Sequence, residues 1–253
     1  MVPLDNQAMT RVLAWDVGEH RSLSLRHALI HRRPGLLGDH PRMPRSVLLV
    51  REVDAPEGWH VFGAGIAEPA VAWLARRGKA FSLLAPESWE GAIRRRSTSV
   101  VRGVVETWVR PVDGPIPSRP SPSIATRRLT PADAIGFAAS APGWALRGWG
   151  DFERLIGEGA AIGVPTRDGR FASIAWIFEA DDGRDSIAVA TDGRFHRLGL
   201  GHAAASALIA VVESDRRKAP LWTVNATNLA SKALARSLGF SARSREYLLH
   251  LHA

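Results

Sequence analysis

Residues 185–201, DSIAVATDGRFHRLGLG, decide the fold of this chain. Residues 186–191 are β-branched or small and are bounded by polar turn formers, which predicts a buried strand. A turn with Gly199 and Gly201 follows, and residues 202–213, HAAASALIAVVE, are almost all good helix formers. The start of a helix presents unpaired backbone N–H groups and the positive end of the helix dipole, and glycine lets a ligand oxygen approach them. The stretch therefore predicts a phosphate-binding turn.

The same glycines also match the pattern of dinucleotide-binding folds, G-x-G-x-x-G/A, over residues 199–204. That interpretation requires an acidic residue at the end of the next strand to hold a ribose, but the next predicted strand, residues 220–225, ends in Asn225. It also requires further parallel strands, and only 52 residues follow Gly201. A dinucleotide site is therefore the weaker of the two interpretations.

The turn resembles the signature Q/R-x-x-G-x-G/A of the GNAT superfamily of acyl-CoA N-acyltransferases. Residues 196–201, HRLGLG, align with it on the glycines and place His196 where the family usually has Arg or Gln. A second stretch, residues 228–240, NLASKALARSLGF, resembles the family's N-x-x-A/S…L-G-F helix. Residues 187–192 and 221–222 look like the zwittermicin-resistance-type subgroup of acetyltransferases. Two motifs in the family's order support the resemblance more strongly than either does alone.

The resemblance implies a binding mode for acetyl-CoA as co-substrate. In this superfamily the acyl-CoA lies where the fourth and fifth strands splay apart, so backbone groups of Ile187, Val189 and Thr191 would face the pantetheine arm. The other cofactor-binding residues that it implies are Arg194, His196, Arg197, Leu198, Gly199, Leu200, Gly201 and His202 in the turn, and Asn228, Ser231 and Lys232 in the second motif. For the basic side chains, pairing with phosphate and plain solvation at the surface are both open.

The expected acid–base residues depart from the family pattern. Many relatives have a Glu on the fourth strand, where this chain has Ser186, and a Tyr on the last motif helix, where it has Ala235. Because an amine nucleophile must lose a proton, three interpretations stay open: a water held by Ser186 is the base, the base comes from elsewhere, or catalysis is lost. Asn225 is the second candidate catalytic residue, although capping of the next turn explains it equally well. Strand alternation directs Asp185 to the face opposite Ser186.

The order of predicted elements indicates an α/β (α+β) protein with two domains. Residues 1–110 form an N-terminal α/β domain, which the resemblance implies is GNAT-like, degenerate and without a cofactor. Residues 111–122, PVDGPIPSRPSP, hold five prolines and predict a linker. The resemblance implies that residues 123–253 form the GNAT domain, with a mixed, splayed sheet in the order β-α-α-β-β-β-α-β-α-β. Its third strand is predicted over residues 170–178.

Composition sets further limits. With 45% apolar residues the chain is folded, and because it contains no cysteine it has no disulfide or thiolate site; we also predict no metal site. The net charge of +8 favours anionic partners, but the Arg residues are scattered and no nucleic-acid-binding motif is present, so binding of nucleic acid is not predicted. Neither a signal peptide nor a membrane span is recognisable, and we expect a cytoplasmic protein. The sequence leaves open whether the chain forms a homodimer.

The sequence thus predicts an N-acetyltransferase that moves an acetyl group from acetyl-CoA directly to a primary amine of a small molecule or peptide. The alternative is a catalytically impaired acyl-CoA-binding regulatory protein. Trp144 and Trp149 are candidates for the wall of an acceptor pocket, although core packing explains them as well.

Overall fold

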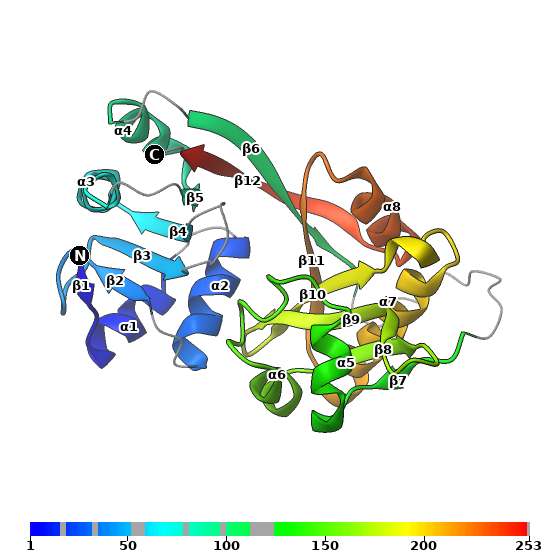
Figure 1. The fold of residues 1–253 in the computed structure, drawn as a ribbon. Coiled ribbons are helices and arrows are strands. Elements are labelled where there is room, and N and C mark those ends of the chain that lie inside the picture. Colours follow the sequence, from blue (N-terminus) through cyan, green and yellow to red (C-terminus); the bar gives the residue numbers. More distant parts are fainter. Residues whose placement is uncertain are drawn as a thin grey trace. The chain divides into compact units, whose positions relative to one another are not determined.

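The computed structural model describes residues 1–15, 19–31, 35–51, 59–77, 81–96, 100–111 and 124–251 (Figure 1). They fall into two compact units. Unit 1 comprises Met1–Glu106, Asn225–Thr227 and Ser244–Ala253, and unit 2 comprises Thr107–Val224 and Asn228–Arg243. The linker predicted at residues 111–122 lies outside the described residues except for Pro111, so the predicted domain limits stay a prediction. No described helix is long and apolar enough to cross a membrane.

Unit 1 is a mixed sheet with helices. Its elements are β1 (Val2–Pro3), α1 (Asn6–Leu13), α2 (Glu19–Ile30), β2 (Leu36–Gly38), β3 (Ser46–Arg51), β4 (Trp59–Gly65), α3 (Ala67–Ala75), β5 (Phe81–Ala85), η1 (Glu87–Trp89), α4 (Glu90–Arg94), most of β6 (Val100–Val109) and the end of β12 (Ser241–Leu251). The strand order within the unit is β1-β2-β3-β4-β5-β12. Strands β4 and β5 are parallel and the other neighbours run antiparallel.

Apolar side chains cover both faces of this sheet. In β3, Val47 and Leu49 belong to a buried cluster with residues of α1 and α2, whereas Leu48 packs with α3 and α4. Alternation along the strand accounts for this division, because successive side chains point to opposite faces. A strand buried on both faces reads as a continuous apolar run, as the sequence SVLLVR shows.

Unit 2 contains the two motifs. Its elements are β7 (Arg127–Arg128), η2 (Pro131–Asp133), α5 (Ala134–Ala138), α6 (Phe152–Glu158), β8 (Ala161–Pro165), β9 (Phe171–Ala180), β10 (Arg184–Thr191), η3 (Gly193–Phe195), α7 (Leu200–Ala210), η4 (Val211–Asp215), β11 (Ala219–Asn225) and α8 (Leu229–Ser237), followed along the chain by β12. This succession confirms the predicted order of elements. The strand order is β11-β10-β9-β8-β7, in which β10 and β11 are parallel and the others antiparallel.

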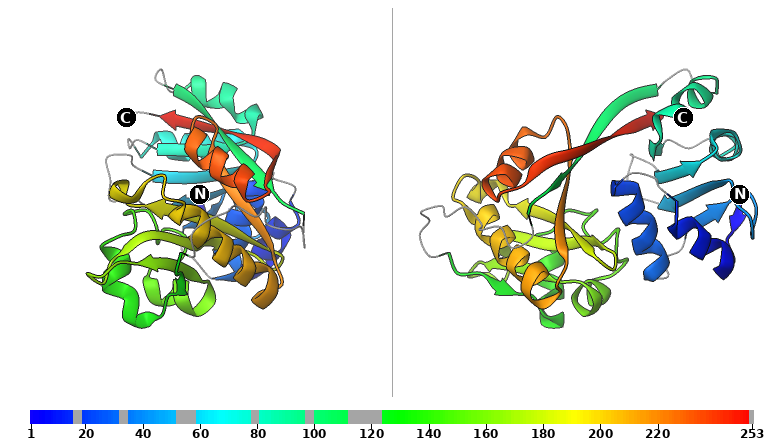
Figure 2. Two further views of the ribbon diagram at one scale, coloured as in Figure 1. Left: turned by 90° about the vertical axis from the view of Figure 1, so that its right-hand side faces the viewer. Right: turned by 180° about the vertical axis from the view of Figure 1, so that it is seen from behind.

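The two units repeat one arrangement. In unit 2 the antiparallel strands β8, β9 and β10 are followed by α7 and by β11, which pairs parallel to β10 (Figure 2). In unit 1 the antiparallel strands β2, β3 and β4 are followed by α3 and by β5, which pairs parallel to β4. A parallel pair needs a crossover connection, and a helix supplies it in both units.

Candidate functional site

The pairing between β10 and β11 stops before the strands end. Parallel pairs run from Arg184↔Ala219 to Ile187↔Trp222, yet β10 continues to Thr191 without a further pair to β11 among the described residues. On its other edge β10 stays paired with β9 as far as Thr191. Residues 185–187 are buried, whereas residues 188–191 are half-buried. The two strands therefore separate beyond Ile187 and leave one edge of β10 open to an extended ligand.

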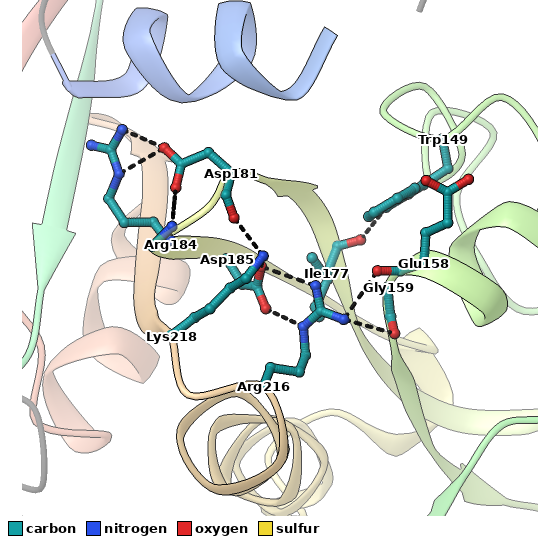
Figure 3. A network of polar contacts seen from close by, with 10 residues as sticks. Trp149, Glu158, Gly159, Ile177, Asp181, Arg184, Asp185, Arg216 and Lys218 are labelled. Atoms are coloured by element: carbon teal, nitrogen blue, oxygen red, sulfur yellow. Dashed lines mark hydrogen bonds and ion pairs between the residues drawn. The ribbon is translucent and has the colours of Figure 1, made fainter. Parts of the chain in front are cut away.

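An ionic network holds the paired end of these strands (Figure 3). Asp185 is fully buried and accepts hydrogen bonds from the Arg216 guanidinium, and Lys218 Nζ lies 3.4 Å from Asp185 Oδ1. Arg216 Nη1 also donates to the Glu158 carbonyl oxygen at 3.0 Å, and Lys218 donates to the Asp181 carbonyl oxygen. As strand alternation predicted, Asp185 is thus engaged away from Ser186. The network ties the start of β10 to the segment before β11 and to the end of α6.

The turn after β10 presents backbone N–H groups. Arg197 and Gly199 both adopt left-handed conformations, with φ of 63° and 80°. For a residue other than glycine this conformation costs about 1–2 kcal/mol, and such strain concentrates at functional turns. Helix α7 starts at Leu200 with Gly199 as its N-cap, and no side chain of the described residues caps its first turn. Uncapped N–H groups at the start of a helix are a ready site for an anion.

Close packing brings this turn against the open edge of β10. A Cβ built on Gly201 would lie 3.1 Å from Thr191 Oγ1 and 3.5 Å from Val189 Cγ1, so α7 approaches the strand through glycine. His196 Nε2 lies 3.0 Å from the Thr191 carbonyl oxygen. Because a carbonyl only accepts, Nε2 carries the proton in this contact. His196, which replaces the usual Arg or Gln, therefore helps to close the turn.

The charge of Arg194 is already engaged. Its guanidinium contacts both carboxylate oxygens of Asp192, the shortest distance being 2.7 Å. Hydrogen bonds from the Arg194 side chain and backbone N–H lower the pKa of Asp192 to about 2. Asp192 thus partly neutralises Arg194, one of the predicted phosphate-binding side chains. The exposed Arg197 makes no such contact with a carboxylate among the described residues.

The second motif forms helix α8, as the resemblance implied. Asn228 is the N-cap of α8, and its Oδ1 accepts a hydrogen bond from the Ser231 backbone N–H at 3.0 Å. The Ser231 hydroxyl accepts from Trp222 Nε1 at 2.9 Å and so links α8 to β11. Lys232 Nζ lies 6.0 Å from the centre of the Trp108 ring. These contacts give Asn228 and Ser231 structural roles, and a role of the three residues in cofactor binding stays a prediction.

The two candidate catalytic residues differ in their surroundings. Ser186 is 4% exposed and lies in the paired part of β10, opposite Leu221 on one side and Glu179 on the other. The Asn225 side-chain oxygen accepts hydrogen bonds from the backbone N–H and the hydroxyl of Thr227, at 3.1 Å and 2.8 Å. Asn225 thus caps the turn after β11, the alternative explanation that its sequence allowed.

Glu179 is an acidic residue of this region that the sequence analysis missed. It is fully buried on β9 and pairs with Ser186. The predicted strand ended at residue 178 and so did not include Glu179. An acidic side chain inside the otherwise apolar run FASIAWIFEA is the signal that could have identified it.

The two tryptophans also differ. Trp149 is fully buried, and its indole donates to the Ile177 carbonyl oxygen at 2.7 Å, so it is a core residue. Trp144 is 37% exposed and packs over Trp176 and Phe178, with ring centroids 5.4 Å and 5.8 Å apart. Trp144 is therefore the one of the two that can still contact an acceptor.

The described residues of unit 1 do not form a turn like the one after β10. In its described part only Ile66 separates β4 from α3, whereas residues 192–199 separate β10 from α7. The Trp89 ring lies 2.5 Å from the position of a Cβ on Gly63, and its indole donates to the Gly65 carbonyl oxygen at 2.7 Å. The Trp89 side chain therefore occupies the space beside the end of β4, beyond the last residue that pairs with β5. Only unit 2 has the geometry of the proposed site among the described residues.

Comparison with known proteins agrees with this geometry. Residues 162–249 match the family model described as FR47-like protein. Over 96 residues the chain is 33% identical to the "Uncharacterized N-acetyltransferase in mutA 5'region" of Streptomyces virginiae, a match that covers 37% of this chain and 40% of that relative.

Solved structures show the same fold over most of the chain. A GCN5-related N-acetyltransferase-like protein of Streptococcus suis is 18% identical with a TM-score of 0.65, covering 86% of this chain and 88% of the other. A GCN5-related N-acetyltransferase of Kribbella flavida is 15% identical with a TM-score of 0.64, covering 93% and 96%. A tandem GNAT protein of the clavulanic acid biosynthesis pathway is 13% identical with a TM-score of 0.61, covering 98% and 97%.

The splayed parallel pair, the glycine turn and these similarities together bear out the predicted resemblance to the GNAT superfamily, whose fold the chain shares. Its fold has the two-domain architecture of the tandem GNAT neighbour. This confirms the predicted superfamily and fold class. The zwittermicin-resistance-type subgroup stays a prediction.

Proposed function

We propose that unit 2 binds acetyl-CoA along the open edge of β10 and transfers its acetyl group to a primary amine. One observation carries this proposal: the separation of β10 from β11 beyond Ile187 leads directly to the uncapped start of α7. The edge of β10 offers backbone groups to the pantetheine amides, and the turn offers N–H groups to the pyrophosphate. Residues 187–191, the turn at residues 194–202 and the start of α8 are the proposed cofactor-binding residues.

The proposed reaction is a direct transfer. The neutral amine attacks the thioester carbonyl carbon, the C–N bond forms, the C–S bond breaks, and the CoA sulfur leaves with a proton. No cysteine is present to form an intermediate thioester. Positioning of both substrates and stabilisation of the oxyanion by backbone N–H groups then supply the main catalytic effects. The acceptor is a small molecule or a peptide, and the cytoplasm, where CoA thioesters are made, is the proposed location.

A regulatory protein that binds acyl-CoA without catalysis is the second candidate. The observation that favours it is the fully buried Ala235 where many relatives have a proton-donating Tyr. The two candidates share the CoA site and differ in turnover alone.

Turnover measurements separate them. The full chain is incubated with acetyl-CoA and a panel of alkylamines, aminoglycosides, polyamines and peptides, and thiol release is followed together with product mass. An amine-dependent release with an acetylated amine as product supports the enzyme. Binding of CoA without release for any acceptor supports the regulatory alternative. An acetylated protein isolable without amine, with ping-pong kinetics, would contradict direct transfer.

A further inference from the structure

A β-bulge in β9 sets the position of the buried Glu179. Along β10 the register runs Ile187↔Ile177 and then Ser186↔Glu179, so Phe178 is the extra residue that pairs with nothing on β10. Without this shift, Ser186 would face Phe178 and Asp185 would face Glu179. Two carboxylates opposite one another in a sheet repel, and the shift pairs Asp185 with Ala180 instead. The bulge therefore moves Glu179 away from Asp185 and beside Ser186.

Directly paired residues project to the same face of a sheet, with Cβ atoms about 4.5–5.5 Å apart. The carboxylate of Glu179 can thus reach the hydroxyl of Ser186, whereas Asp185 is engaged with Arg216 on the other face. Ser186 lies one residue before the point where β10 and β11 separate. The pair Glu179–Ser186 therefore lies next to the proposed thioester position.

The loop before α6 supports the bulge. A Cβ on Gly148 would lie 1.9 Å from the Phe178 carbonyl oxygen and 3.5 Å from Glu179 Cγ, so the loop approaches both residues only because position 148 is a glycine. Phe178 is half-buried and packs against Trp144. The face that carries Glu179 and Ser186 is thus also the face that carries the half-exposed aromatic side chains. Bulges next to active sites commonly re-aim a side chain in this way.

We propose that Glu179 accepts the proton of the incoming ammonium group through the hydroxyl of Ser186. The inference rests on the proposed function and names the base that the fourth strand lacks. The ammonium N–H bond breaks as its proton passes to Ser186 Oγ, while the Ser186 hydroxyl proton passes to a Glu179 oxygen. The neutral amine then forms the C–N bond, and the second amine proton leaves with the CoA sulfur. Glu179 acts through Ser186 and is a positioning residue for proton transfer, and its carboxylate returns its proton to solvent.

Three variants test this role: Glu179→Gln, Ser186→Ala and, as a matched control, Glu153→Gln, which changes an exposed carboxylate on α6. Two acceptors are compared: an alkylamine from the panel, which is protonated at neutral pH, and an added aromatic amine, which is already neutral. Glu179→Gln should lower kcat for the alkylamine by roughly 10²-fold or more, the usual contribution of an acid–base group. Ser186→Ala should lower it by roughly 10- to 100-fold, because a water can bridge the gap. Glu153→Gln should leave kcat unchanged for both acceptors.

The neutral amine distinguishes proton transfer from packing. It needs no deprotonation before attack, so Glu179→Gln should leave its kcat within a few-fold of the unchanged protein. An equal loss for both amines, with calorimetric CoA binding intact, would overturn the role, and so would an unchanged alkylamine rate. If Glu179→Gln does not fold, Glu179→Asp replaces it, and selective loss with the alkylamine is again required. If the unchanged protein acetylates no amine, the proposed function and this role are both overturned. If the unchanged protein is active but the variants show no selective loss with the alkylamine, only the role is overturned.

Discussion

Asp185→Asn should destabilise the protein by about 3 kcal/mol. Asp185 is fully buried and pairs with Arg216 and Lys218, whose side chains are 17% and 18% exposed. Removing one partner of a buried ion pair costs about 3–5 kcal/mol because the remaining charge loses its compensation. Both cations here keep some contact with water and an Asn oxygen can still accept a hydrogen bond, so we expect the lower end of that range.

The assay measures the Tm of the full chain by calorimetry during thermal unfolding. For a protein of this size 1 kcal/mol corresponds to about 2–4 °C, so Tm should fall by about 6–12 °C. Asp215→Asn is the matched control, because its partner Arg128 is 51% exposed and Asp215 itself 55% exposed. Such surface pairs contribute about 0.2–1 kcal/mol. Equal, small changes for the two variants would refute the view that the buried network holds the paired end of β10 and β11.

Two further predictions concern the bulge and the phosphate turn. Gly148→Ala should cost about 1–3 kcal/mol in chemical denaturation, because its Cβ would lie 1.9 Å from a β9 carbonyl oxygen, whereas Gly143→Ala, which meets nothing within 4 Å, should be neutral. In an NMR titration Asp192 should show a pKa of about 2 that rises toward 3.8 in Arg194→Gln. Because the pKa of Asp192 is lowered in the folded state, its contact with Arg194 stabilises the fold at pH values above the ordinary pKa of 3.8, and this stabilisation is lost as the pH falls toward 2. An unchanged Asp192 titration midpoint in Arg194→Gln would contradict this cause.

The sequence predicts local features of the site well. The strand expected at residues 186–191 is β10, Arg184–Thr191, and the helix expected after Gly201 is α7, which starts at Leu200. The helix that the resemblance implied within residues 228–240 is α8, Leu229–Ser237. Each of these features depends on residues close in the chain, so glycine, helix propensity and capping residues are sufficient to indicate them.

Pairing between distant segments could not be predicted in the same way. The shift that places Glu179 opposite Ser186 is one residue long and leaves no trace in strand propensity. The sequence likewise does not show that Tyr247 on β12 pairs with Ala85 on β5, or that the Arg102 guanidinium lies 3.6 Å from the centre of the Tyr247 ring. Register and partner choice depend on contacts between faces, which a single sequence does not display.

Calorimetric titration of the full chain with CoA tests the central claim most directly. We expect one CoA per chain, because unit 2 has the open edge and the uncapped turn and unit 1 has Trp89 in the corresponding position. Gly199→Val should abolish binding, since its left-handed φ of 80° disfavours a β-branched residue. Gly193→Ala, in the same turn and with open space around its Cβ, should preserve binding. Absence of binding at millimolar CoA, or equal binding by the Gly199→Val variant, would contradict the account.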